Sequence, residues 1–313
     1  MGLGAVLYTV LGGMKAVIYT DTFQWIILMG GLIGIGIPLG YLAVGGWDGL
    51  QQHLPASHFS LGNLGWKQAV NWAFTIIPIW FVGMTLYQRI FACKDEKTAK
   101  KAWFLAGLFE YPIMAFMGVL LGMFARAGAD QGMFAADGFA SAAALGDEEV
   151  ALPMFLRSIL PAGLTGLMLS AYFSAIMSTA DSCLMAASGN FVTDLTSIGK
   201  GSAKSVIRWS QAITLITGIL AILLALTVDQ VLDLMLGSYG IMVASMLVPV
   251  LALLTGIKLS RRGALSTMLA GALVTGAFML AEGMTDQELL WGFKPLIPGI
   301  LASMAVALMD VLR

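Results

Sequence analysis

Residues 206–228 read VIRWSQAITLITGILAILLALTV, with Arg208 as the one charged residue. An apolar run of this length matches a hydrocarbon core of about 30 Å. Similar runs recur along all 313 residues, of which 58% are hydrophobic and 11% charged, with a mean hydropathy of +0.86. A soluble domain carries about 25% charged residues, so these values exclude a soluble enzyme and a disordered chain. An outer-membrane barrel would instead show short alternating segments.

The pattern of apolar runs predicts an all-α polytopic membrane protein, because open sheet edges and extended loops cannot face lipid. We expect eight full spans and one stub. The stub covers residues 1–13, and the spans cover 21–45, 68–92, 102–126, 161–190, 206–228, 231–255, 264–284 and 291–312. We expect residues 1–313 to form one transmembrane domain that is incomplete at its N-terminus. The stub is too short to cross a bilayer, so either Met1 is an internal residue of a longer protein or the chain is naturally short.

Lys and Arg are unevenly divided between the two sets of loops that alternate along these spans. One set holds thirteen of them and the other holds four. The set richer in Lys and Arg faces the cytoplasm in most membrane proteins. We therefore expect an integral plasma (inner) membrane protein, surrounded by lipid, with a cytoplasmic C-terminus. The net charge of −1 leaves no basic footprint for nucleic acid.

The fourth span contains the richest group of polar residues, in Ala171-Tyr-Phe-Ser-Ala-Ile-Met-Ser-Thr-Ala-Asp-Ser182. At about 100° per residue, Ala175, Ser178, Thr179 and Ser182 share one helix face, and Asp181 lies at its edge. Hydroxyls, carbonyls and a carboxylate suit a hard cation such as Na⁺. A stripe of small residues also suits close helix packing. The carboxylate favours the ion, because packing does not require one.

Two charged residues lie near the cytoplasmic ends of the first two spans. Asp21 is a candidate cation ligand, and it also suits an N-cap or a first-turn acid that the helix dipole stabilises. Arg89 is expected to anchor or snorkel at the end of its span.

Three further residues are candidates for contacting a substrate. Trp80 lies near the middle of the second span, where it can line a cavity or pack against a neighbouring helix. Ser238 and Tyr239 lie between Gly237 and Gly240, a pattern that predicts a locally loosened helix. Broken helices of this kind bind substrates in many transporters. The sequence contains no nucleophile–base set or metal-ligand cluster, so we do not expect an enzyme.

Two segments together resemble the sodium:solute symporter family. Tyr8-Thr-Val-Leu-Gly-Gly-Met-Lys-Ala16, continuing through Tyr19-Thr-Asp-Thr-Phe-Gln24, looks like the end of the family's signature and the helix start that follows it. Residues 175–182, continuing to Asp194, look like its sodium-binding helix. Tyr87-Gln-Arg89 followed by Lys94 resembles a further landmark, and the landmarks follow the family's order.

This resemblance implies a LeuT-like fold of two inverted five-helix repeats, here without its first three core helices. It implies that Na⁺ binds the carbonyl of Ala175 and the hydroxyls of Ser178 and Thr179. The implied second sodium site contains Asp21, Ser178, Asp181 and Ser182. The implied activity is sodium-coupled symport of a small organic solute by alternating access.

The resemblance also bears on the solute. Sugar-transporting members carry an acidic residue where this chain has Gly83, and the Ala-Asp-Ser form at 180–182 is similar to choline-transporter-like members. An amino-acid-, choline- or carboxylate-like solute is therefore favoured over a sugar. The alternative is a non-transporting membrane sensor or scaffold, or the remnant of a transporter.

Overall fold

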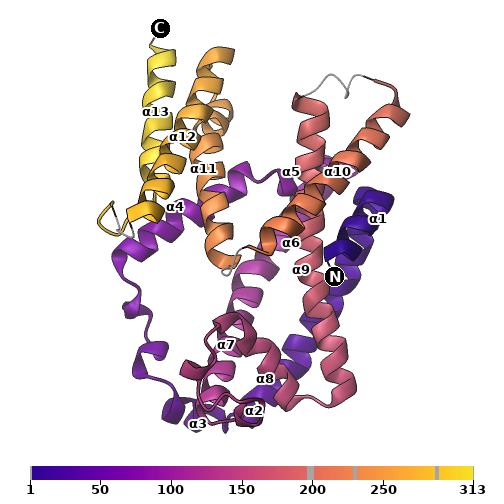
Figure 1. Cartoon of the computed structure of the whole chain (residues 1–313), viewed down its shortest axis with the longest axis vertical. Helices are drawn as coiled ribbons and strands as arrows, with labels where there is room; N and C mark the ends of the chain where they lie inside the picture. The colour runs from indigo at the N-terminus through magenta and orange to yellow at the C-terminus, as the bar shows by residue number, and fades with distance from the viewer. Residues whose placement is uncertain (1, 196–200, 228–230, 286–288, 313) are drawn as a thin grey trace. The chain divides into compact units, whose positions relative to one another are not determined.

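A computed structural model of the chain describes residues 2–195, 201–227, 231–285 and 289–312 (Figure 1). Every regular element in these residues is a helix, and none of them is a strand. This confirms the predicted all-α class. The α-helices are α1 (Gly2–Gly31), α2 (Ile37–Ala43), α3 (Gly46–His53), α4 (Trp66–Val82), α5 (Met84–Phe91), α6 (Glu96–Leu108), α7 (Ala115–Asp130), α8 (Ala151–Ile159), α9 (Ala162–Asn190), α10 (Ala203–Ala225), α11 (Val231–Thr255), α12 (Arg261–Thr285) and α13 (Leu296–Val311). Short π-helical segments cover Leu32–Gly36, Phe109–Met114 and Phe191–Leu195, and 3₁₀ turns cover Ala56–Phe59, Leu61–Asn63, Ala135–Asp137, Ala142–Ala144 and Glu148–Val150.

Seven helical stretches in the described part of the chain are long and apolar enough to cross a membrane. They are Gly2–Ala43, Trp66–Phe91, Glu96–Asp130, Ala162–Asp194, Ala203–Ala225, Leu234–Thr255 and Arg261–Met284. The predicted eighth span is the 16-residue α13, which is shorter than the roughly 20 residues of a typical span. The predicted stub and first span form one stretch that kinks at Gly13, where φ is 58° and ψ is −163°. Glycine adopts this backbone conformation without steric cost.

Proline and glycine interrupt the other long helices. Pro38 is the second residue of α2, just after the π-helical segment Leu32–Gly36, and Pro112 lies inside the segment Phe109–Met114. Each proline lacks the N–H that would bond four residues back, so the helix widens locally. The predicted span at 68–92 is two helices, because the backbone at Gly83 is extended, with φ −67° and ψ 106°.

The contacts divide the chain into two compact units. Unit 1 comprises residues 1–61 and 88–223. Helices α1 and α9 pack along each other in this unit. Its core is formed by buried apolar side chains, which include Leu28, Leu121, Phe124, Phe155 and Met168. This core holds the polar faces of α1 and α9 in a fixed relation.

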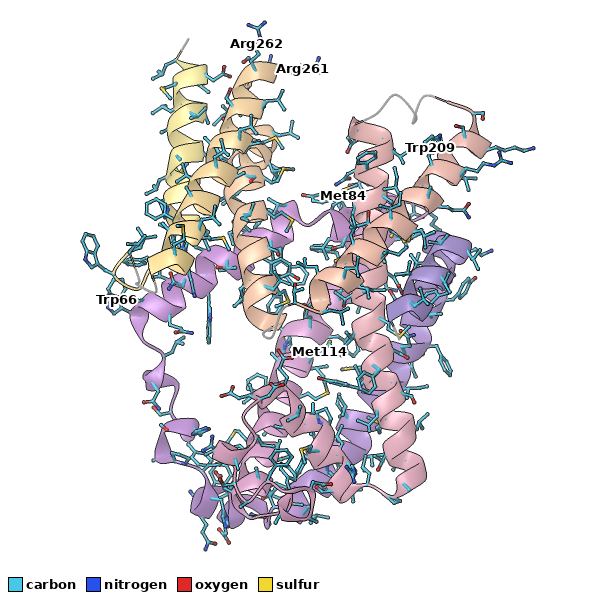
Figure 2. All side chains as sticks on the ribbon, in the orientation of Figure 1. Trp66, Met84, Met114, Trp209, Arg261 and Arg262 are labelled. Atoms are coloured by element: carbon cyan, nitrogen blue, oxygen red, sulfur yellow. The ribbon has the colours of Figure 1, made fainter. Side chains whose placement is uncertain are left out.

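Unit 2 comprises residues 62–87 and 224–313, with α11, α12 and α13 packed on one another and α4 against α11. The hydroxyl of Ser303 on α13 lies 2.7 Å from the Ala244 carbonyl oxygen and 2.8 Å from that of Thr267. A side chain at Gly271 would collide with the Ala244 carbonyl. Small residues permit this close approach, as in many membrane helices. Figure 2 shows Arg261 and Arg262 at the start of α12, at the end of unit 2 away from Trp66.

Helix α11 runs without interruption from Val231 to Thr255, so the predicted loosening at Gly237 and Gly240 does not occur. Gly240 is buried, and the nearest atoms to a side chain placed there belong to Leu296 at the start of α13. These glycines therefore serve helix packing rather than a break in the helix.

Candidate functional site

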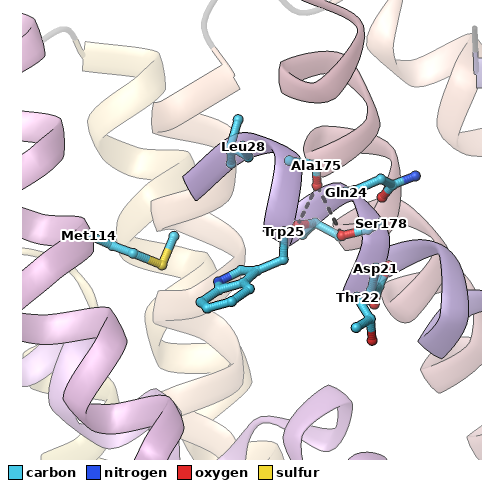
Figure 3. A pocket seen from close by; sticks show the side chains of 9 residues that line it. Asp21, Thr22, Gln24, Trp25, Leu28, Met114, Ala175 and Ser178 are labelled. Atoms are coloured by element: carbon cyan, nitrogen blue, oxygen red, sulfur yellow. Dashed lines mark hydrogen bonds between the residues drawn. The ribbon is translucent and has the colours of Figure 1, made fainter. Parts of the chain in front are cut away.

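Unit 1 contains a cavity of about 530 Å³ between α1, α9 and the π-helical segment before α7 (Figure 3). It gathers four of the predicted cation ligands, although they lie on two helices far apart in the sequence. The lining residues are Asp21, Thr22, Gln24, Trp25, Leu28, Met114, Ala175, Ser178 and Thr179. Asp181 and Ser182 are not among them.

On α9, two hydroxyls are turned toward the same backbone carbonyl. Ser178 Oγ lies 3.1 Å from the Ala175 oxygen and Thr179 Oγ1 lies 3.5 Å from it, as the dashed lines in Figure 3 mark. One turn further along, Ser182 Oγ donates to the Ser178 carbonyl at 2.8 Å. A hydroxyl that donates its proton in this way keeps its oxygen lone pairs for a cation. The α9 wall of the cavity thus presents one carbonyl and two hydroxyl oxygens.

On α1, Asp21 and Gln24 lie one turn apart and face the same cavity. Asp21 Oδ1 and Gln24 Oε1 are buried, and neither has a hydrogen-bond partner among the described residues. A buried acceptor without a partner costs about 1–3 kcal/mol. A sodium ion would satisfy both oxygens together with those on α9, so the donor set fits a hard monovalent cation.

Arg89 on α5 brings a cation to this set. Its Nη2 atom donates to Asp21 Oδ2 at 2.8 Å and to Ser182 Oγ at 2.7 Å. The ion pair is partly open to solvent, with side-chain exposures of 40% for Arg89 and 21% for Asp21. Arg89 was expected to anchor or snorkel, and instead its guanidinium joins two residues of the predicted second sodium site. Asp21 lies eight residues beyond the kink inside α1, so it is neither an N-cap nor a first-turn acid.

Asp181 lies in a different environment. It is completely buried, and its Oδ1 atom accepts a hydrogen bond from Thr9 of α1 at 2.6 Å. Within the described chain its Oδ2 atom has no hydrogen-bond partner. Thr9 precedes the kink at Gly13 and Asp21 follows it, so Asp181 contacts the segment of α1 before the kink, whereas Asp21 belongs to the segment after it.

The predicted substrate residues belong to unit 2. Trp80 and Tyr239 are half-buried, and Ser238 is exposed and donates to the Leu234 carbonyl at 2.8 Å. A second cavity, of about 610 Å³, lies in this unit and is lined by Gly237 and Gly240 but not by these three residues. Sequence reasoning missed Gln24, although its position one turn after Asp21 was a usable signal.

The chain is similar in sequence to known membrane transporters. Residues 1–271 match the model of the sodium:solute symporter family. The chain is 29% identical to the sodium/pantothenate symporter of Haemophilus influenzae over 307 residues, covering 94% of this chain and 59% of that protein. It is 29% identical to sodium/glucose cotransporter 4 of Mus musculus over 218 residues, covering 60% of this chain and 31% of that protein. It is 32% identical to sodium/myo-inositol cotransporter 2 of Rattus norvegicus over 228 residues, covering 62% and 33%.

This chain therefore spans about a third of the length of the animal cotransporters that it matches and somewhat more than half of the bacterial symporter. The family match covers well over half of the chain and includes the two segments on which the resemblance rests. The chain is an integral membrane protein of helical type, and it belongs to the sodium:solute symporter family.

Proposed function

We propose that the protein to which this chain belongs couples the entry of Na⁺ to the uptake of a small organic solute by alternating access. In this proposal Na⁺ binds the carbonyl of Ala175 and the hydroxyls of Ser178 and Thr179. The observation that carries the proposal is the cavity that these residues share with Asp21, in which buried oxygens lack partners within the described chain. Family membership supports sodium as the coupling ion.

A second sodium site would use Asp21, Asp181 and Ser182. Two of these residues are already bridged by the guanidinium of Arg89. We propose that a second ion binds Asp21 and Ser182 when Arg89 withdraws. For Asp181 to share that ion, the contact with Thr9 would have to rearrange.

The membrane potential would drive both ions inward. Moving one elementary charge through the field supplies about 2.3 kcal/mol per 100 mV. The thirteen-to-four division of Lys and Arg supports a cytoplasmic C-terminus. We further propose that both units belong to one transporter domain, as expected from the sequence.

The proposed solute is a small organic molecule. The relatives are named for glucose, myo-inositol and pantothenate. The glycine at position 83 and the Ala-Asp-Ser form at 180–182 favour an amino-acid-, choline- or carboxylate-like solute over a sugar. Trp80, Ser238 and Tyr239 are the proposed contacts. Competition of unlabelled compounds from each class against uptake would identify the solute.

The sodium site is tested by removing its two hydroxyls. In the whole protein, Ser178→Ala combined with Thr179→Ala should abolish sodium-dependent uptake, because two of the three proposed ligands are lost. The matched control is Ser188→Ala with Thr193→Ala, which removes two hydroxyls further along the chain and outside the cavity. Uptake at the wild-type level in the first variant would refute the site.

The second site has a separate test. Asp21→Asn keeps the size of the side chain and removes its charge. If a second sodium binds here, the number of sodium ions carried per solute should fall by one. An unchanged stoichiometry, measured from reversal potentials, would remove Asp21 from the proposed ligands.

A further inference from the structure

The cavity in unit 2 has no role in the proposed sodium site, since none of its lining residues lines the sodium cavity. Its volume of about 610 Å³ falls within the range of about 300–1,000 Å³ that is usual for small-molecule sites. Polar and charged side chains from three segments face it, namely Gln68, Asn71 and Trp72 of α4, Thr275 and Glu282 of α12, and Lys294 before α13.

The wall of this cavity is preorganised by contacts between α4 and the loop before α13. Asn71 is 7% exposed, its Nδ2 atom donates to the Gly292 carbonyl at 2.8 Å, and its Oδ1 atom accepts from the Lys294 backbone N–H at 3.0 Å. The ammonium of Lys67 donates to the Trp291 carbonyl at 2.5 Å. These bonds fix the backbone that carries Lys294.

Trp66, labelled in Figure 2, adds an aromatic contact between the same two segments. Its ring centroid lies 5.6 Å from that of Phe293, in an edge-to-face arrangement. The walls of this cavity are already ordered before a ligand binds. Binding therefore costs less conformational entropy than it would in a flexible site.

The cavity presents one charge of each sign. Glu282 lies near the end of α12 and Lys294 in the following loop, and among the ion pairs of the described residues neither takes part. A purely anionic ligand would be attracted by Lys294 and repelled by Glu282. A purely cationic ligand would be attracted by Glu282 and repelled by Lys294. A zwitterion is complementary to both charges.

Uncharged groups complete the site. Thr275 is fully buried, and its hydroxyl has no hydrogen-bond partner within the part of the chain that the structure describes. The indole of Trp72 and the side chain of Met279 supply an apolar wall. Ligand sites typically combine such walls with a few polar groups that orient the ligand.

We propose that this cavity binds a small zwitterionic solute of amino-acid type, with its carboxylate toward Lys294 and its ammonium toward Glu282. The site lies within unit 2 and is separate from the sodium cavity. Binding should therefore occur without Na⁺ and should survive the loss of the Ser178 and Thr179 hydroxyls.

The test compares ligands that differ in one charge. Radiolabelled L-leucine is the probe, in equilibrium dialysis against the purified whole protein in detergent. Leucinamide lacks the carboxylate, 4-methylpentanoate lacks the ammonium, and myo-inositol is a neutral polyol. We expect saturable leucine binding that leucinamide and 4-methylpentanoate displace at least about tenfold less well, and that myo-inositol does not displace.

Charge variants test the assignment of each end. Glu282→Gln and Lys294→Gln should each weaken leucine binding about tenfold, and Glu282→Gln should bring 4-methylpentanoate close to leucine in affinity. The controls Glu149→Gln and Lys258→Gln change exposed charges outside the cavity and should leave binding unchanged.

Several results would overturn the proposal. They are the absence of saturable leucine binding to the folded wild-type protein, equal displacement by all four compounds, or equal binding by the cavity and control variants. The ligand comparison uses the wild-type protein, so it stands even where a variant does not fold. Leucine binding that persists in the Ser178→Ala, Thr179→Ala protein would separate this site from the sodium site, whichever of the two proposals fails.

Discussion

Replacement of Arg89 by glutamine should strengthen sodium binding. The guanidinium donates to Asp21 Oδ2 at 2.8 Å and to Ser182 Oγ at 2.7 Å, and both oxygens belong to the proposed second sodium site. A sodium ion that binds these oxygens must first displace the guanidinium. The free energy that holds Arg89 in place is therefore subtracted from the free energy of sodium binding.

The magnitude follows from the two contacts of Arg89. The ion pair is partly solvated, with side chains 40% and 21% exposed, and pairs of this kind contribute about 0.2–1 kcal/mol. The hydrogen bond to Ser182 contributes about 1 kcal/mol more. A total of about 1–2 kcal/mol corresponds to roughly a 5- to 30-fold change in affinity. The half-saturating sodium concentration of Arg89→Gln should fall by that factor.

The assay is uptake of labelled solute by the whole protein in proteoliposomes, at sodium concentrations that cover the half-saturation point. Arg126→Gln is the matched control. Arg126 pairs with Asp130 at 2.9 Å, with side-chain exposures of 45% and 23%, outside the sodium cavity. Both variants lose one comparable ion pair, and only Arg89→Gln should change the sodium dependence.

The reasoning fails if Arg89→Gln has the same half-saturating sodium concentration as Arg126→Gln. A higher concentration would also refute it, because Arg89 would then hold Asp21 in position for sodium instead of competing with it. Equal amounts of both variants reconstituted into the proteoliposomes make the comparison valid.

Two further predictions concern stability and local structure. Gly271→Ala should lower the free energy of unfolding by about 1–3 kcal/mol, because the added side chain would collide with the Ala244 carbonyl. A side chain at Gly276 on the same helix meets no atom within 4 Å, so Gly276→Ala should be neutral or stabilising. Chemical denaturation of both variants measures the difference. Asp95, outside the spans, caps α6 by accepting from the Thr98 backbone N–H at 2.7 Å, and this bond lowers the pKa of its carboxyl. Its stabilising contribution should be complete above the unfolded pKa of about 3.9 and should fade as the pH falls through the lower folded pKa. Amide exchange at Thr98 should show that loss in the wild type, and an exchange profile in Asp95→Asn with the same acid dependence would contradict this cause.

The sequence was sufficient to predict the elements that depend on local pattern. Hydropathy marks the spans, and helical spacing puts Ala175, Ser178 and Thr179 on one face. The kink at Gly13 was not predicted, because the stub and the first span were expected to be separate segments. The prediction of a loosened helix failed because the two glycines were interpreted without knowledge of their tertiary contacts. Gly237 and Gly240 looked like a break, yet α11 is continuous because Gly240 is buried beside Leu296.

Contacts between distant residues were beyond the reach of such patterns. Arg89 lies 68 positions from Asp21 and 93 from Ser182, and Thr9 lies 172 positions from Asp181. Periodicity within one helix places a residue on a face but does not identify the helix that this face meets. The partners of Asp21 and Asp181 therefore required the structure.

The two carboxyl groups are now distinguished by these partners. Burying a carboxylate is costly unless a cation or hydrogen-bond donors compensate its charge. Arg89 provides a cation for Asp21, so a sodium ion that displaces the guanidinium replaces one positive charge by another. Asp181 has one hydroxyl donor and no ion pair among the described residues. A sodium ion at Asp21 thus competes with an existing cation, whereas one at Asp181 would meet no ion-paired cation among the described residues. Arg89→Gln should therefore change the contribution of Asp21 to sodium binding and leave that of Asp181 unchanged.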